Sequence, residues 1–254
     1  MHRPSLTNAT AAIGLALGFA FGAPPIGAES LDIGRATFAE QDAKTEQIST
    51  DELRRILVDG AAILLDTRTA AEYAAGHIPG AHFLGDNAAT QLAALTQLVG
   101  GDKSKALVVY CNGPYCQASR RFSEQLLAAG FANVRRYQLG MPVWRALGGP
   151  TEINLDGLRR VYGRDQTATF IDARPPDDFA LGSLPGAKNL PVESFAAGEI
   201  KRPPLPQDDF NTRVVLFGSD AKQARTLAQA LSTRPWHNVS YVAATFEEVR
   251  ASVK

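Results

Sequence analysis

Short apolar runs alternate with amphipathic segments along this chain. Residues 62–65 and 106–110 are almost wholly apolar runs of strand length, a pattern typical of parallel strands that are buried on both faces. Leu53, Ile56 and Leu57 instead fall on one face of a helix. Helices are also predicted at residues 69–75, 87–99 and 117–129, and a strand at residues 133–137. This alternation predicts an α/β fold in which a mostly parallel sheet is flanked by helices.

The chain repeats itself at an offset of 106 residues. Asp66 and Arg68 recur as Asp172 and Arg174, and Gly-His-Ile-Pro-Gly-Ala at 76–81 recurs as Gly-Ser-Leu-Pro-Gly-Ala at 182–187. We therefore expect two domains of one fold, at residues 29–150 and 151–254. In the second we predict strands at 169–172 and 214–217 and a helix at 221–232. A proline-rich loop at 201–206 replaces the helix at 87–99 in length.

The two copies differ at a cysteine. Val-Val-Tyr-Cys at residues 108–111 corresponds at this offset to Val-Val-Leu-Phe at residues 214–217, so Phe217 is matched with Cys111. A phenyl ring cannot take up a sulfur atom. We therefore expect one working domain and one that lacks the catalytic cysteine.

The N-terminus resembles a secretory signal. His2 and Arg3 precede an uncharged apolar run at residues 11–22, and prolines and small residues fill positions 23–28. We expect residues 1–28 to be a signal peptide, cleaved after Ala28, and the mature protein to be periplasmic or secreted. The run is shorter than the roughly 20 residues that span a bilayer, so no stable membrane span is expected. An uncleaved interfacial anchor is the alternative.

Composition narrows the function further. Of the 254 residues, 45% are hydrophobic and 20% charged, and the formal net charge is zero. These values indicate a globular protein and favour no nucleic-acid partner. The histidines and the two cysteines show no metal-ligand spacing, so no metal is expected.

Both cysteines lie within six residues, Cys111 and Cys116. A disulfide between them would close so short a loop that it would add little stability. An exported chain meets an oxidising compartment, where such a disulfide can form. Since it would add little stability, the spacing indicates a reactive rather than a structural role for the two cysteines.

Cys111 follows a predicted buried strand and precedes a predicted helix. The first turn of a helix presents free backbone N–H groups and the positive end of the helix dipole, which together favour a thiolate. Gly113 allows the chain to curl there. We predict Cys111 as the catalytic residue and a substrate-binding loop formed by Asn112, Gly113, Pro114, Tyr115, Cys116 and Gln117.

These motifs together resemble tandem-domain rhodaneses, members of the sulfurtransferase family. The resemblance covers nearly all of the expected mature chain, in two copies, and includes Trp144 with Gly148 and Pro150 at the end of the first domain. It implies a cysteine that cycles between thiolate and persulfide without metal or organic cofactor. It also implies a small sulfane-sulfur donor such as thiosulfate, and a thiol, cyanide-like or protein-thiol acceptor. We interpret Asp66, Arg68, Glu72 and His77 as structural support for the loops.

Several alternatives remain at this point. Phosphatases and arsenate reductases of this fold use a Cys-x5-Arg loop, but Gln117 stands where that arginine is needed, which disfavours oxyanion chemistry. Cys116 is either a small helix-cap residue or a resolving partner for Cys111. Its loop also resembles rhodanese modules attached to regulators. A thiol–disulfide or persulfide-sensing protein is therefore the second functional hypothesis, and a non-catalytic binding module the third.

Overall fold

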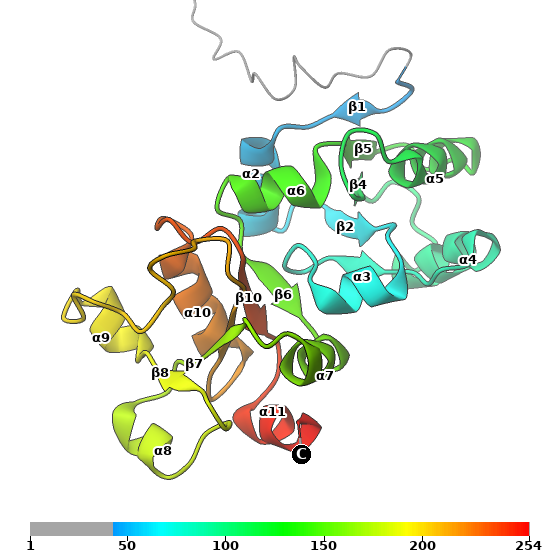
Figure 1. The fold of residues 1–254 in the computed structure, drawn as a ribbon. Coiled ribbons are helices and arrows are strands. Elements are labelled where there is room, and N and C mark those ends of the chain that lie inside the picture. The colour runs from blue at the N-terminus through cyan, green and yellow to red at the C-terminus, as the bar shows by residue number, and fades with distance from the viewer. Residues whose placement is uncertain (1–42, 254) are drawn as a thin grey trace, which may run out of the picture. The chain divides into compact units, whose positions relative to one another are not determined.

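The computed structural model describes residues 43–253, which form two five-stranded parallel sheets with helices packed on them (Figure 1). The predicted α/β class is confirmed. The first sheet has the strand order β1-β5-β4-β2-β3, and the second β6-β10-β9-β7-β8. The first half comprises β1 (Glu46–Gln47), α2 (Thr50–Asp59), β2 (Ile63–Asp66), α3 (Ala70–Ala75), β3 (His82–Phe83), α4 (Ala88–Leu98), β4 (Leu107–Tyr110), α5 (Gln117–Ala128), β5 (Val134–Tyr137) and α6 (Gly140–Ala146).

The second half repeats this order of strands and helices, with a shorter helix before its central strand. It comprises β6 (Thr151–Ile153), α7 (Leu155–Arg164), β7 (Thr169–Asp172), α8 (Pro176–Ala180), β8 (Lys188–Asn189), α9 (Val192–Ala196), β9 (Val214–Phe217), α10 (Ala221–Leu231), β10 (Val239–Val242) and α11 (Phe246–Ser252). The short α9 and an irregular stretch through residues 201–206 occupy the place of α4.

Side chains of the first sheet alternate between two apolar layers, as the period of a strand requires. Val108 and Tyr110 of β4 belong to the layer that contains residues of α2 and α6. Val109 belongs to the opposite layer, with Phe122 of α5 and residues of α4. The end of β4 therefore lies between two packed layers, and whatever follows it emerges at the carboxyl edge of the sheet.

Local sequence explains where the helices begin. The Ser49 hydroxyl accepts a 3.1 Å hydrogen bond from the Glu52 N–H, which caps α2. Thr69 and Glu72 form the reciprocal capping box that starts α3. In α2 the Glu52 side chain instead pairs with Arg135 at 2.9 Å, so only half of a capping box forms there.

The sheet register corrects the alignment of the two copies. Asp66 is the partner of Tyr110, and Asp172 is the partner of Phe217. Phe217 therefore corresponds to Tyr110, and Gly218 takes the place of Cys111. The prediction that Phe217 stands at the cysteine position is wrong by one residue, because the offset of 106 holds through β8 but is 107 at β9. The second domain still has no thiol at this position.

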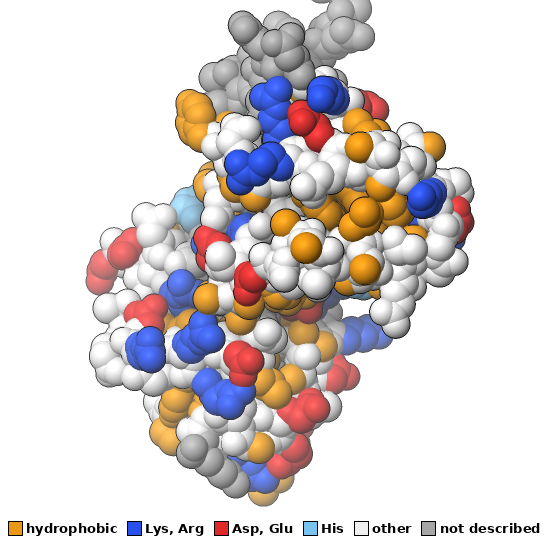
Figure 2. Space-filling model, turned by 90° about the vertical axis from the view of Figure 1, so that its right-hand side faces the viewer, with side chains coloured by type: hydrophobic (Ala, Val, Ile, Leu, Met, Phe, Trp, Pro, Cys, Tyr) orange, Lys and Arg blue, Asp and Glu red, His pale blue; other side chains and the backbone are white. Residues whose placement is uncertain are grey.

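The surface charge and the helix lengths bear on the remaining predictions. On the face shown in Figure 2, basic and acidic side chains are interspersed, in keeping with a formal net charge of zero. Among residues 43–253, every helix is too short or too polar to cross a membrane. The predicted signal peptide, residues 1–28, lies outside the described residues.

Candidate active site

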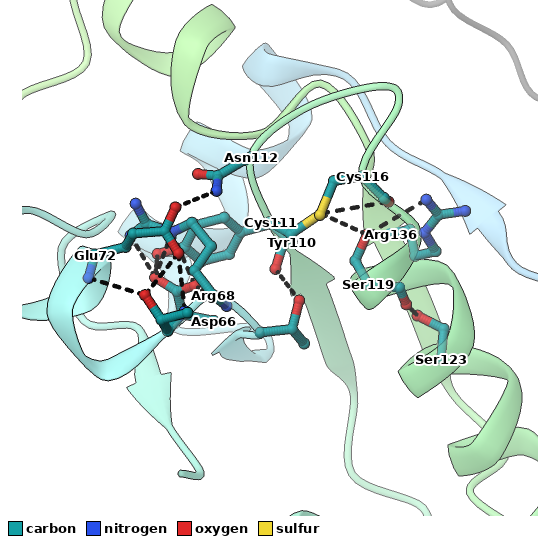
Figure 3. The surroundings of a disulfide bond; sticks show 12 residues. Asp66, Arg68, Glu72, Tyr110, Cys111, Asn112, Cys116, Ser119, Ser123 and Arg136 are labelled. Carbon is teal, nitrogen blue, oxygen red and sulfur yellow. Dashed lines mark hydrogen bonds and ion pairs between the residues drawn. A yellow bond between two sulfur atoms is a disulfide. The ribbon is translucent and has the colours of Figure 1, made fainter. Parts of the chain in front are cut away.

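Cys111 is the first residue after β4, and its side chain is buried, with 1% of its surface exposed. It forms a disulfide with Cys116, whose Cα lies 6.3 Å away (Figure 3). Cys116 is the N-cap residue of α5, but its side chain makes no capping hydrogen bond. It is also only half-buried. Cys116 is thus both the residue that precedes α5 and the disulfide partner of Cys111.

The loop between the cysteines is held from behind by α6. The Met141 N–H donates a 3.2 Å hydrogen bond to the Cys111 carbonyl. Gly140, with φ of 62°, lies so close that a β-carbon there would be 2.3 Å from the same oxygen. Gly113 has φ of 118°, so the predicted need for glycine in the loop is met by a backbone conformation that other residues rarely adopt.

Of the remaining loop residues of the predicted substrate site, Pro114 is half-buried and the other three face outward. Asn112, Tyr115 and Gln117 are exposed, and Tyr115 exposes 87% of its surface. The Cys116 N–H donates to the Gly113 carbonyl at 3.0 Å, which closes a turn inside the loop. These residues form a rim around the cysteines.

On one side of the loop, Asn112 binds Glu72. The Asn112 amide donates to one carboxylate oxygen of Glu72, while the other oxygen accepts from Thr69. Partial burial would raise the pKa of Glu72, but the hydrogen bonds from Thr69 and Asn112 and the charge of Arg68 together lower it. Glu72 therefore carries a negative charge that ties α3 to the loop.

Behind the same side lies a buried ion pair. Arg68 forms a bidentate pair with Asp66, with contacts of 3.0 and 2.6 Å, and also donates to the Gly76 carbonyl at 2.8 Å. The Tyr110 hydroxyl donates a 2.6 Å hydrogen bond to Asp66. Burial, followed by the Asp66 charge, raises the pKa of Tyr110 well above its ordinary value. Burial would lower the pKa of Arg68, but Asp66 raises it.

The second domain keeps this ion pair although it has no cysteine. Arg174 contacts Asp172 at 3.0 and 2.7 Å and the Gly182 carbonyl at 2.8 Å. The Ser183 hydroxyl donates to Asp172 at 2.6 Å, in place of the tyrosine hydroxyl. The pair thus forms the same contacts with or without a neighbouring thiol.

His77 does not reach the cysteine. Its ring stacks on Tyr73, with centroids 3.8 Å apart, and its Nδ1 lies 2.9 Å from the Tyr73 carbonyl. Its Nε2 lies 3.4 Å from a carboxylate oxygen of Glu152, on β6. Of the four residues predicted as structural support, Asp66, Arg68 and Glu72 surround the loop, whereas His77 contacts the strand that opens the second sheet.

Two site residues escaped the sequence analysis, Ser119 and Arg136. The Cys111 sulfur lies 3.3 Å from the Ser119 hydroxyl, and Arg136 donates to that hydroxyl at 3.4 Å (Figure 3). Both residues are fully buried. The available signals were two adjacent arginines inside a predicted strand and a serine on the apolar face of a helix. Across residues 43–253, no three His, Cys, Asp or Glu side chains gather where they could hold a metal.

The chain matches the family model of the rhodanese-like domain over residues 49–147 and again over residues 157–252. These two matches cover most of the chain. The protein therefore belongs to the rhodanese-like family, as a tandem of two such domains, which confirms the resemblance seen in the sequence.

Individual relatives are more distant. An HTH-type transcriptional regulator of Mycobacterium tuberculosis, Rv0324, is 37% identical over 108 residues, which are 42% of this chain and 45% of that protein. The chain thus matches less than half the length of this curated relative. A thiosulfate sulfurtransferase from Pseudomonas aeruginosa is 21% identical, with 83% and 44% of the two chains covered and a TM-score of 0.36. The 3-mercaptopyruvate sulfotransferase SseA of Escherichia coli is 20% identical, with 79% and 98% covered and a TM-score of 0.37.

Proposed function

We propose that this protein is an exported sulfurtransferase that carries sulfane sulfur on Cys111. The Cys111 thiolate attacks the outer sulfur of a donor such as thiosulfate, forms a persulfide, and releases the rest of the donor as an anion, sulfite in that case. An acceptor thiolate or cyanide then attacks the terminal sulfur and takes it, which restores the thiolate. No metal or organic cofactor enters this cycle, because sulfur moves with its bonding electrons supplied by each nucleophile in turn.

The observation that carries the proposal is the place of Cys111. It is the first residue beyond the central strand β4, in the loop that leads into α5, within a domain of the rhodanese-like family. Ligands of open parallel sheets bind at the carboxyl ends of the strands. The outward-facing rim of Asn112, Tyr115 and Gln117 is where we place the donor. Export is a separate part of the proposal and rests on the apolar run at residues 11–22.

A second function is favoured by the disulfide itself. The bond between Cys111 and Cys116 supports the hypothesis of a thiol–disulfide or persulfide-sensing protein. In this form Cys111 has no thiolate to attack a donor. Two thiols of a reductant must first exchange with the bond, so that both cysteines are reduced and the reductant leaves as a disulfide. The two functions are compatible if the reduced form transfers sulfur.

Intact mass separates these functions. The mature protein, first reduced, is incubated with thiosulfate, with glutathione persulfide or with oxidant. Gain of one sulfur atom, absent in Cys111→Ser, supports transfer, because an oxygen cannot form the persulfide. Loss of two hydrogens without any sulfur gain supports the redox function instead. Turnover that persists in Cys111→Ser would exclude the assigned nucleophile.

Export is tested separately. N-terminal mass analysis of extracytosolic material should show a mature protein that starts at Glu29.

A further inference from the structure

We propose that Arg136, acting through the Ser119 hydroxyl, stabilises the thiolate of Cys111, which is the form that attacks the donor and becomes the persulfide. This inference rests on the proposed sulfur transfer and assigns Ser119 as a catalytic residue and Arg136 as a positioning residue for it. Ser119 contacts the reacting sulfur, whereas Arg136 acts one residue behind it.

The geometry defines a chain of three polar groups. The guanidinium of Arg136 donates to the Ser119 oxygen at 3.4 Å, and that oxygen lies 3.3 Å from the Cys111 sulfur. A hydroxyl oxygen that accepts from a cation directs its own hydrogen elsewhere, and the sulfur is the acceptor in reach. A hydrogen bond to the charged form of a group favours that form. The hydrogen bonds from Arg136 to Ser119 and from Ser119 to the sulfur therefore favour the negatively charged form of Cys111.

The fold explains why these groups meet. Alternation along β5 places Arg136 on the same sheet face as Val134, which packs in the layer beneath α5. Ser119 lies on the buried face of α5, one turn before Phe122 of that layer. The serine and the arginine thus approach from a helix and a strand that cover one another, directly beside the loop.

The serine, the arginine and the cysteine are all buried. Arg136 and Ser119 expose none of their surface, and Cys111 exposes 1%. A buried guanidinium is expensive unless other groups compensate it, and Arg136 has partners in addition to Ser119. In a water-excluded site its influence on a neighbouring sulfur is stronger than it would be at the surface.

The second domain provides an internal comparison on the strands. Val109 is the register partner of Arg136, and the corresponding Leu216 is the partner of Tyr241. Tyr241 therefore stands where Arg136 stands in the first domain. Its hydroxyl donates to Glu152 at 2.7 Å, so it belongs to an unrelated contact.

The helices show the same replacement. The buried positions of α5 are Ser119, Phe122, Ser123 and Leu126, and those of α10 are Ala224, Leu227, Ala228 and Leu231. The spacing is identical, so Ala224 corresponds to Ser119. The domain without a cysteine thus also lacks the hydroxyl and the guanidinium, although it keeps the Asp172–Arg174 pair. This difference indicates that Ser119 and Arg136 serve the thiol, whereas the ion pair serves the fold.

Other charged and polar groups near the loop act from different directions. Beside β2 and α3, Asp66 accepts from Arg68 and Tyr110, and Glu72 accepts from Asn112. On α5, Glu124 pairs with Arg120 at 3.3 Å and with Lys44 at 3.8 Å.

One backbone group opposes the proposed effect. The Cys116 carbonyl oxygen lies 3.4 Å from the Cys111 sulfur, and once the disulfide is reduced it accepts from the thiol and so favours the protonated form. The Ser119 contact at 3.3 Å is therefore the one that favours the anion.

The decisive measurement is the thiolate titration of Cys111, followed by ultraviolet absorbance in full-length protein that carries Cys116→Ser. Ser119→Ala and Arg136→Met should each raise the titration midpoint by about one pH unit, a roughly tenfold loss of thiolate below the midpoint. Arg136→Lys, which keeps the charge, should recover part of the shift. Ser123→Ala is the matched control, because Ser123 is buried on the same helix face and donates only to the Ser119 carbonyl.

The outcomes separate the two proposals. An unchanged midpoint in folded Ser119→Ala overturns the inference by itself, even if Arg136→Met fails to fold. A shift as large in Ser123→Ala also overturns it, since it would reflect loosened packing of α5. If the midpoints shift as expected but the reduced wild-type protein gains no sulfur from any donor, the sulfur-transfer function fails while the role of Ser119 and Arg136 stands.

Discussion

Gly140 faces the carbonyl oxygen of Cys111 so closely that a β-carbon on it would be 2.3 Å from that oxygen. This contact and the hydrogen bond from the Met141 N–H to the same oxygen fix the position of the cysteine loop relative to β4. Helix α6 therefore supports the site from a position that contains no reactive group.

We expect Gly140→Ala to displace the cysteine loop. The φ of 62° costs an alanine about 1–2 kcal/mol, and the clash with backbone atoms adds to this. Gly100→Ala is the matched control, because Gly100 has the same φ of 62° but open space around its Cα. Urea unfolding should show a larger loss for Gly140→Ala, and persulfide formation should fall only in that variant. Equal losses in the two variants would show that the loop contact has no role.

Tyr110→Phe should destabilise the first domain by about 1–3 kcal/mol, because it leaves buried groups without a partner. The Tyr110 hydroxyl donates to Asp66 and accepts from the Ile78 N–H at 3.1 Å. Tyr115→Phe removes a hydroxyl from an exposed ring and should change the free energy of unfolding by less than about 0.5 kcal/mol. Chemical denaturation of both variants checks this. A neutral Tyr110→Phe would mean that water or Arg68 replaces the lost bond.

Cys116→Ser should make Cys111 more prone to irreversible oxidation. With Cys116 present, a sulfenic acid on Cys111 condenses with the second thiol, releases water and forms the disulfide seen here. Without it, peroxide carries the sulfenic acid on to sulfinic acid. Mass mapping of Cys111 after peroxide treatment measures the yield. Equal sulfinate yields in wild type and variant would reduce Cys116 to a helix-cap residue.

The contact of Glu152 with His77 and Tyr241 should give stability an acid-sensitive component. Burial would raise the pKa of Glu152, but these two partners lower it below 4.5. A carboxylate whose pKa is lower in the folded state stabilises the fold above its ordinary pKa, and this contribution disappears as the pH falls through the folded value. Glu152→Gln should therefore flatten the decline in the free energy of unfolding below about pH 4.5. Glu199→Gln, an exposed carboxylate, should leave that decline unchanged.

Much of the architecture could be predicted because it depends on local patterns. The strands at residues 169–172 and 214–217 appear with the predicted bounds, and α5 begins at Gln117 as expected. Short β1 and β6 were not predicted as strands, since two or three residues carry no periodicity. Their pairing is decided by the neighbouring strands β5 and β10.

The alignment of the two copies shows where local reasoning ends. Eight residues separate Tyr110 from Ser119, and six separate Phe217 from Ala224, so the loop of the second domain is two residues shorter. A constant offset hides this difference. The Thr67 N–H donates to the Tyr110 carbonyl, and the Ala173 N–H to the Phe217 carbonyl. These bonds align Tyr110 with Phe217, and only this alignment reveals the difference in loop length.

By itself, the sequence determined the α/β class, the duplication, the single thiol-bearing loop and the polar residues next to it, because these depend on periodicity and on residues close in the chain. Only the tertiary structure decided that His77 turns toward Glu152, and that Ser119 and Arg136 lie behind the Cys111 sulfur. Strand pairing and helix packing bring these groups together across many residues. No local pattern encodes which buried polar side chain will face the thiol, since that depends on the register of β5 and the rotation of α5 over the sheet.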